Sequence, residues 1–258
     1  GNEYASGDKL GLNLPGLQEE LLETVTAVGK PVVLVISAGS ALDLSWADAH
    51  VAAIIDSFYP GARGGKAVAE AIFGDFSPSG KLPVTFYQGT ENLPEFTDYD
   101  MSDRTYRYTD KNVLYPFGYG LHYGTIRYEN AQISCAQCSV RDAVDVSVDV
   151  INESSYTIHE SVQAYIQHEE ADAYEPGYQL KGIQTVTLQP KETKRVTISL
   201  KARDFAIITQ EGECVVRPGS YRIAIGGQQP DARSAKLTGS DVAALVVRRE
   251  GAQTPVEY

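Results

Sequence analysis

Residues 59–86 read YPGARGGKAVAEAIFGDFSPSGKLPVTF, and this stretch indicates how the first half of the chain folds. Gly64 and Gly65 allow a tight turn just before a segment whose small apolar residues recur at helical spacing. Gly74 stands where a helix would end in the left-handed conformation. The run Ser-Pro-Ser-Gly that follows is a turn signal, and the apolar residues 82–86 come after it. The stretch therefore predicts a glycine turn, a helix, a second turn and a short strand.

The two glycines before the helix have two explanations. Backbone N–H groups at the start of a helix can bind a phosphate, and glycines would let the ligand approach them. The stretch contains neither GxxxxGK[ST] nor GxGxxG. Close packing of the helix against a strand is therefore favoured, and phosphate binding is the alternative.

The residues before this stretch alternate between helical and extended patterns. Residues 31–37 read PVVLVIS, a β-branched run that is typical of a parallel strand buried on both faces. Residues 51–55 read VAAII and predict a second short strand. Residues 10–87 thus predict an α/β layer, which is too short for a complete doubly wound domain and looks like the back portion of one. A helix is expected before the first strand, with an apolar face made of Leu17, Leu21, Leu22, Val25 and Val28.

Residues 88–113 form a long polar segment without periodicity. A loop of this length in a compact protein is usually functional or packed against a neighbour. Its Tyr99, Arg104 and Tyr106 are amphipathic side chains suited to a domain interface or to contact with a sugar. The alternative is a loop that only joins two domains.

From Ile126 onward the pattern changes to short strands. Valines at 144–150 alternate with Asp and Ser, so one face of that strand should be buried and the other wet. Further short strands are expected at 162–167, 183–188, 195–200 and 220–225. Several strands at this spacing predict a β-sandwich. Near the end of the chain, Arg248, Arg249 and Glu250 are expected to form a solvated end.

Composition excludes several classes of partner. The chain has 258 residues, of which 43% are apolar, and a net charge of −12. The charge argues against nucleic acid or an anionic membrane as a partner, since both bind a basic surface. No apolar run reaches the roughly eighteen residues of a transmembrane helix. The sequence opens without a start methionine or a signal pattern, so we expect a fragment or a processed chain.

The three cysteines are Cys135, Cys138 and Cys214. Cys135 and Cys138 have CxxC spacing, but no second pair and no nearby histidine completes a zinc site. We therefore expect no metal and no cofactor. The odd number of cysteines favours a cytoplasmic location, whereas a secreted protein would need a signal in a preceding segment.

Two stretches resemble known domains. Residues 59–86 resemble the signature of the C-terminal α/β sandwich domain of glycoside hydrolase family 3, which contains β-glucosidases and β-xylosidases. YQLKGIQTVTLQPKETKRVTISL followed by RPGSYRIAIGG resembles the fibronectin type III-like domain that follows it in many members. The resemblance implies a truncated sandwich domain at 1–124, a fibronectin type III-like domain at 125–248 and a tail at 249–258. The expected fold is α/β with mostly parallel strands, followed by an all-β, immunoglobulin-like sandwich.

Residues 115–123, YPFGYGLHY, are similar to the segment that leads out of the family's sandwich domain. His122 stands where the family usually has a serine. A lone histidine in such a place is more often a hydrogen-bonded structural residue than a catalyst, so we interpret His122 as structural.

The resemblance also implies hydrolysis by two carboxyl groups about 5 Å apart, with retention of configuration. The family's nucleophile is an Asp in a Ser-Asp-Trp segment of an N-terminal (β/α) barrel, and this sequence contains neither the segment nor the barrel. The acid/base is a Glu upstream of a segment that here looks like residues 7–15, GDKLGLNLP. Glu3 is the one carboxylate that could stand there, and the alternative is a residue that precedes Gly1.

The resemblance therefore implies the C-terminal portion of an exo-acting β-glucosidase or β-xylosidase. The expected partners are the N-terminal barrel, as a domain or a separate chain, and a β-linked oligosaccharide or glycoside; assembly into a homo-oligomer is open. The alternative is a non-catalytic carbohydrate-binding or scaffold module, an idea that the 16 tyrosines support. Trp46, the only tryptophan, is expected in a core rather than on a sugar-binding surface.

Overall fold

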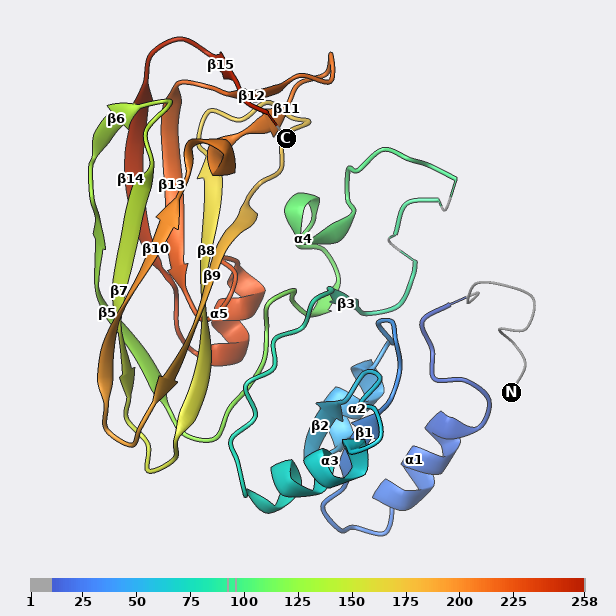
Figure 1. Cartoon of the computed structure of the whole chain (residues 1–258). Helices are drawn as coiled ribbons and strands as arrows, with labels where there is room; N and C mark the ends of the chain where they lie inside the picture. The colour runs from blue at the N-terminus through green and yellow to red at the C-terminus, as the bar shows by residue number, and fades with distance from the viewer. Residues whose placement is uncertain (1–10, 92, 96, 258) are drawn as a thin grey trace. The chain divides into compact units, whose positions relative to one another are not determined.

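The computed structural model describes residues 11–91, 93–95 and 97–257, and the chain divides into two compact units (Figure 1). The α/β unit comprises the described residues up to Phe76 together with Pro83–Tyr106 and Asp110–Phe117. The β-sandwich unit comprises Ser77–Leu82, Arg107–Thr109 and the residues from Gly118 onward.

In the α/β unit, helices and parallel strands alternate along the chain. β1 (Val33–Ile36) and β2 (Ala53–Asp56) pair in parallel. Two further short strands, β3 (Phe86–Tyr87) and β4 (Val113–Tyr115), pair antiparallel. The helices are α1 (Gln18–Thr26), α2 (Ser45–His50) and α3 (Gly64–Phe73), and the single turn α4 (Thr105–Tyr108) begins in this unit and ends in the β-sandwich unit. The predicted α/β alternation is therefore confirmed.

The turns around α3 follow from backbone sterics. Gly74 ends the helix with φ +80°, the left-handed conformation that the sequence predicts. A Cβ built at Gly64 would lie 2.5 Å from the Pro60 side chain, so only glycine allows this approach. Gly64 is thus explained by the tight turn that follows Pro60. Trp46, expected in a core, is half-buried in α2 and stacks on His50 with ring centroids 4.3 Å apart.

The strand expected at 82–86 is shorter than predicted. It begins only at Phe86, because Pro83 has no N–H to contribute to a ladder. Leu82 instead donates its N–H to the Tyr119 carbonyl at 2.8 Å, and its own carbonyl accepts from the Gly118 N–H at 2.7 Å. The start of the predicted strand is therefore held within the β-sandwich unit.

The predicted burial of the α/β unit is wrong for this chain. β1 was expected to be buried on both faces, yet Val33 and Val35 are 39% and 41% exposed. On α1, Leu21 is 64% exposed and only Leu22 is buried. In the described residues β1 has a single hydrogen-bonded neighbour, β2, so one edge and much of its surface have no covering layer. Leu17, Val25 and Val28 share this exposure.

The β-sandwich unit contains two main sheets. The first has five strands in the order β6-β14-β13-β8-β9, and the second has three in the order β10-β7-β5. A small third sheet has the order β11-β12-β15. The strands of the second sheet, and those strands of the first sheet that the sequence predicted, confirm that the second half of the chain is all β. The bounds are β5 Ile126–Ile133, β6 Gln137–Ser139, β7 Val144–Asn152, β8 Ile158–His168, β9 Gln179–Leu188, β10 Thr193–Leu200, a 3-10 turn Ala202–Phe205, β11 Ile207–Ile208, β12 Cys214–Val216, β13 Gly219–Gly226, α5 Ala232–Thr238, β14 Ala243–Glu250 and β15 Thr254–Pro255.

The core of this unit lies where the alternation in β7 predicts it. The inward side chains of β7 meet apolar side chains of β8, β9, β10 and β13 in one cluster. Burial of these aliphatic groups stabilises the fold by roughly 1.5–3 kcal/mol per side chain. Fully buried members include Val144, Val146, Val148, Val150, Val162, Leu188, Leu200, Ile223 and Ile225.

Arg249 is not part of a solvated end, as the sequence suggested, but is buried in strand β14. Its Nη2 donates to the carbonyls of Val140 (2.8 Å) and Asp142 (2.9 Å). The guanidinium also lies over the Phe205 ring, 4.2 Å from its centroid. Carbonyl oxygens and a ring face can stabilise a buried cation without a carboxylate partner. The short run of charged residues at 248–250 does not reveal these contacts, because their partners are distant in the sequence.

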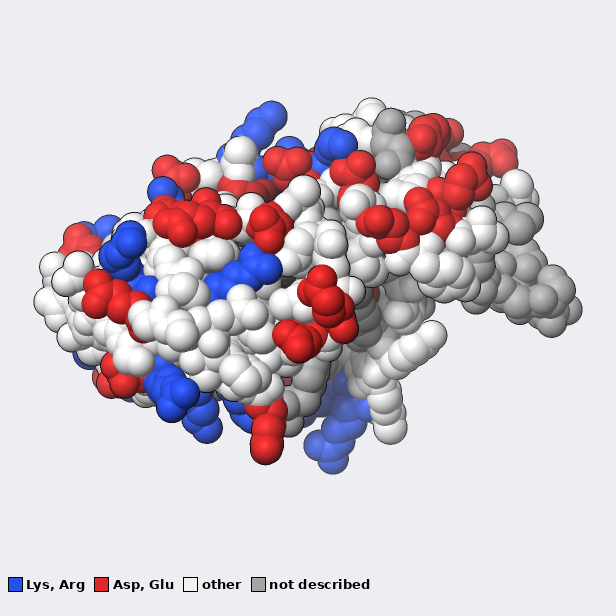
Figure 2. All heavy atoms as spheres, turned by 90° about the horizontal axis from the view of Figure 1, so that it is seen from above, with Lys and Arg blue, Asp and Glu red and all other residues white. Residues whose placement is uncertain are grey.

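The surface carries charges of both signs. On the face shown in Figure 2, acidic side chains lie among basic ones without a continuous basic surface. In the part of the chain that the structure describes, no helix has the length and apolar character needed to cross a bilayer.

Candidate functional site

The polar segment after β3 is organised around Arg104. Its Nη2 donates to the carbonyls of Glu95 (2.7 Å) and Asp98 (2.6 Å), and its Nε donates to the Asp100 carbonyl (3.2 Å). Asp98 and Asp100 in turn accept backbone N–H groups two residues ahead, which shapes two tight turns. Hydrogen bonds from Ser102 hold the pKa of Asp100 below its usual range. Arg104 therefore fixes the path of the loop.

The other two residues predicted in this loop have different surroundings. Tyr99 is 89% exposed. Tyr106 stacks on Phe117 with ring centroids 4.1 Å apart and planes 8° from parallel. The backbone between them is strained, since Asp103 and the β-branched Thr105 both have positive φ. The structure thus places Tyr99 where a partner or ligand can reach it, and Tyr106 against a neighbouring ring.

Glu3, the candidate acid/base, lies outside the described residues, and so do residues 7–10 of the segment 7–15 that defined its position. No statement on its geometry follows.

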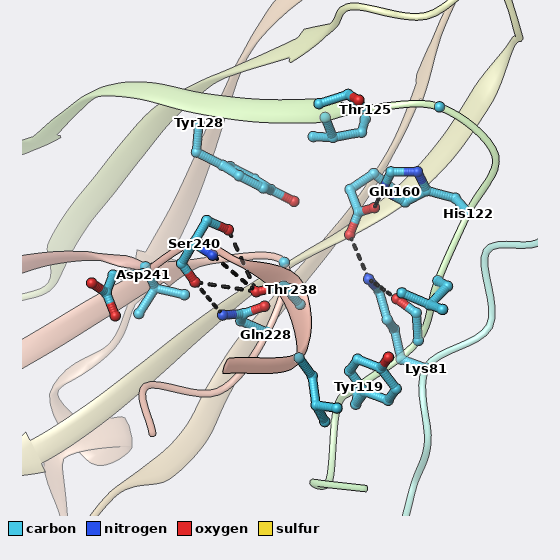
Figure 3. Close-up of a pocket in the computed structure, with 17 residues that line it drawn as sticks. Lys81, Tyr119, His122, Thr125, Tyr128, Glu160, Gln228, Thr238, Ser240 and Asp241 are labelled. Carbon is cyan, nitrogen blue, oxygen red and sulfur yellow. Dashed lines mark hydrogen bonds and ion pairs between the residues drawn. The ribbon is translucent and has the colours of Figure 1, made fainter. Parts of the chain in front are cut away.

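A cavity of about 260 Å³ lies in the β-sandwich unit (Figure 3). Glu160 of β8 and Tyr128 of β5 reach it from different strands, and Lys81 reaches it from the turn before Leu82. The Lys81 ammonium lies 3.0 Å from Glu160 Oε1 and donates to the Gly120 carbonyl at 3.3 Å. A nearly buried carboxylate therefore meets its counter-charge from a segment 79 residues earlier in the chain.

His122 lines the same cavity. Its Nε2 is 3.6 Å from Glu160 Oε2. Burial lowers the pKa of His122, although the Glu160 carboxylate acts in the opposite direction. The imidazole is therefore neutral near pH 7, in keeping with a structural role.

Tyr128 has an unusual environment for a phenol. Burial raises the pKa of Tyr128 well above its ordinary value, and the neighbouring Glu160 carboxylate raises it further. Tyr128 is therefore a neutral hydroxyl, able both to donate and to accept a hydrogen bond.

The Cys138 thiol of the CxxC pair is only weakly acidic. Burial raises the pKa of Cys138 to about 11, so the thiol is protonated near pH 7 and is a poor nucleophile. Among residues 11–91, 93–95 and 97–257, no group of three or more His, Cys, Asp or Glu side chains could hold a metal ion.

Comparison with known proteins identifies the two halves of the chain. Residues 1–123 match the glycosyl hydrolase family 3 C-terminal domain, and residues 160–229 match the fibronectin type III-like domain. The first 123 residues therefore belong to the C-terminal domain of glycosyl hydrolase family 3. The recognition made from residues 59–86, and the fold that it implied, are thereby confirmed.

Individual β-xylosidases and β-glucosidases align along most of this chain. A β-xylosidase of Formosa agariphila is 35% identical over 90% of the chain and 33% of its own length. A periplasmic β-glucosidase of Salmonella typhimurium is 31% identical over 88% of the chain and 31% of its own length. The solved structure of a β-glucosidase from Erythrobacter marinus covers 95% of the chain with a TM-score of 0.80 and 34% identity, and 31% of that protein is aligned. The chain thus spans about a third of the length of these relatives.

The cavity escaped the sequence reasoning, apart from His122. One signal was present: Glu160 sits at an inward position of a strand that is otherwise buried and mostly apolar, IHESVQAYIQH. A charged residue in such a place needs a partner or a function. The identity of the partner, Lys81, could not be read from the sequence.

Proposed function

We propose that this chain is the C-terminal portion of an exo-acting retaining β-glycosidase, a β-glucosidase or β-xylosidase that hydrolyses terminal non-reducing β-D-glycosyl residues. The observation that carries the proposal is the family 3 match together with relatives named as β-xylosidase and β-glucosidase. In this proposal the sandwich domain reaches to residue 124 and the fibronectin type III-like domain follows it.

The catalytic pair is divided between two parts of the enzyme. The nucleophilic Asp is contributed by an N-terminal (β/α) barrel, as a domain or a separate chain. The acid/base is Glu3 or a residue that precedes Gly1. Retention then follows from double displacement through a covalent glycosyl-enzyme.

The exposed apolar surface of the α/β unit supports a partner of this kind. Leu21 on α1, Leu17 and Val28 at the two ends of this helix, and Val33 and Val35 on β1 expose far more apolar area than single scattered residues would. We assign this surface to contact with the barrel-containing part of the enzyme. The loop around Arg104 then presents Tyr99 either to the sugar or to the barrel.

Hydrolysis of nitrophenyl glycosides tests the proposal. The chain alone should not hydrolyse nitrophenyl β-glucoside or β-xyloside, and the chain joined to a family 3 barrel should hydrolyse at least one of them with retention. Full activity of the chain alone, or inactivity of a correctly folded joined protein, would contradict the proposal.

A binding or scaffold module is the second candidate, and the exposure of Tyr99 favours it. A ring that is 89% exposed can stack on a sugar face. Trp46 does not add to this idea, since it stacks on His50. If the wild-type chain binds insoluble xylan or cellulose and the Tyr99→Ala variant does not, this candidate is supported. If the wild-type chain binds neither polysaccharide, the candidate is wrong.

A further inference from the structure

The cavity of the β-sandwich unit is larger than the gaps that packing ordinarily leaves. Its volume of about 260 Å³ has room for about nine water molecules at ~30 Å³ each. Pockets for drug-sized ligands start near about 300 Å³. The size therefore suits one small ring rather than a chain of linked rings.

Three buried polar atoms of the cavity residues lack a hydrogen bond of good geometry among the residues that the structure describes: Tyr128 Oη, Glu160 Oε1 and His122 Nδ1. Tyr128 and Glu160 are close enough for the carboxylate to act on the hydroxyl. The Lys81 ammonium is close to Glu160 Oε1 as an ion pair but not in hydrogen-bond geometry. Figure 3 shows Tyr128 and Glu160 extending toward the same space. Because buried polar groups without hydrogen bonds cost free energy, a ligand that satisfies both is favoured.

The charges around the cavity determine which ligand fits. Glu160 and Lys81 neutralise each other, and Asp241 adds a further negative charge to the lining. An anion would therefore be repelled, and a cation would have to compete with Lys81 for Glu160. A neutral ligand with several hydroxyl groups meets the requirement, since a hydroxyl can donate to a carboxylate and accept from a phenol.

The rest of the lining agrees with such a ligand. It combines the aromatic ring of Tyr119 with aliphatic groups and with further polar side chains. Mixed linings of this kind bind small molecules through apolar contact and a few directed hydrogen bonds. The polar members besides those already described are Thr125, Gln228, Thr238 and Ser240.

The geometry points to a binding site for a single neutral sugar ring in this cavity, with Tyr128 and Glu160 as its principal hydrogen-bonding groups. The inference goes beyond the proposed hydrolysis, because it assigns a ligand to the fibronectin type III-like half of the chain and requires no reaction there.

Titration of the full 258-residue chain with D-xylose and D-glucose, followed by protein-observed NMR, tests the site. At least one sugar should bind saturably in the millimolar range and shift resonances of Tyr128 and its neighbours. Tyr128→Phe keeps the ring and removes the hydroxyl, so it should weaken binding about two- to tenfold, as expected for one hydrogen bond. Gly227→Ala should abolish binding, because its Cβ would lie 2.6 Å from Tyr128 Oη and 3.1 Å from Glu160 Oε1.

Gly177→Ala is the matched control, since its Cβ would make only an ordinary contact of 3.5 Å with the Arg107 carbonyl. It should bind the sugar like the wild type. If neither sugar binds saturably up to about 100 mM, a hundredfold above a Kd of ~1 mM, the inference is overturned. Undiminished binding by a folded Gly227→Ala would also overturn it. Because no hydrolysis is measured, failure here leaves the glycosidase proposal standing, and inactivity of the joined enzyme leaves this site standing.

Discussion

The two units use the same kind of apolar sequence with different results. In the β-sandwich unit, Leu188 of β9 and its neighbours from both sheets are fully buried. In the α/β unit, Leu21 of α1 and Val35 of β1 remain 64% and 41% exposed. The difference lies in the number of layers that the chain supplies: two packed sheets in one case, and a two-stranded parallel sheet in the other. An apolar pattern therefore indicates which face of an element is suited to burial. Whether that face is buried depends on whether the chain supplies a second layer that packs against it.

The largest expected effect contrasts one leucine from each unit. Leu188→Ala should lower the free energy of unfolding by about 3–5 kcal/mol, because it leaves a cavity in the sandwich core. Leu21→Ala should change it by less than about 0.5 kcal/mol, since its side chain is exposed and alanine is a good helix former. Urea unfolding of both variants checks this. Similar losses in the two would show that α1 is covered in solution and would break the comparison.

A smaller effect concerns alkaline pH and the sandwich unit alone. Burial raises the pKa of Tyr221 to about 12, from about 10 in an unfolded chain. The contribution of the neutral Tyr221 side chain to the free energy of unfolding is fully present below about pH 10. It is lost as pH rises from about 10 to 12, because the unfolded state releases the proton first. A two-unit shift corresponds to about 2–3 kcal/mol. Tyr221→Phe should flatten this part of the curve of unfolding free energy against pH, and the exposed Tyr156→Phe should not. Identical slopes in both variants would contradict the assignment.

The smallest expected effect lies within the α/β unit. Gly74→Ala should destabilise by about 1–2 kcal/mol, since alanine is strained at φ +80° even though the space around it is open. Gly65→Ala, inside α3 with no atom within 4 Å of its Cβ, should instead stabilise by about 0.5–1 kcal/mol. Thermal unfolding of the two variants sharpens the comparison. The midpoint temperature should fall for Gly74→Ala and rise for Gly65→Ala, although both residues belong to the same helix and its C-terminal cap. Equal shifts would show that the helix is frayed in solution.

Local patterns predicted much of the fold. The alternation in β7, the end of α3 at Gly74 and the helix–strand order up to β2 depend on neighbours within a few residues, and all are found in the structure. The strand at 82–86 failed for a local reason as well, because Pro83 interrupts it. The candidate site was less predictable, since Glu160 and Lys81 gave no sign that they would meet.

From the sequence alone came the family signature at 59–86, the α/β order followed by short strands, and the expectation that the catalytic nucleophile lies outside this chain. The tertiary structure alone decided that Arg249 is buried among carbonyls, that Leu21 is exposed, and that Lys81, Tyr128 and Glu160 surround one cavity. The physical reason is the range of the interactions. Periodicity and turn chemistry act over a few residues, whereas these contacts join segments that lie tens of residues apart and exist only once the layers have packed.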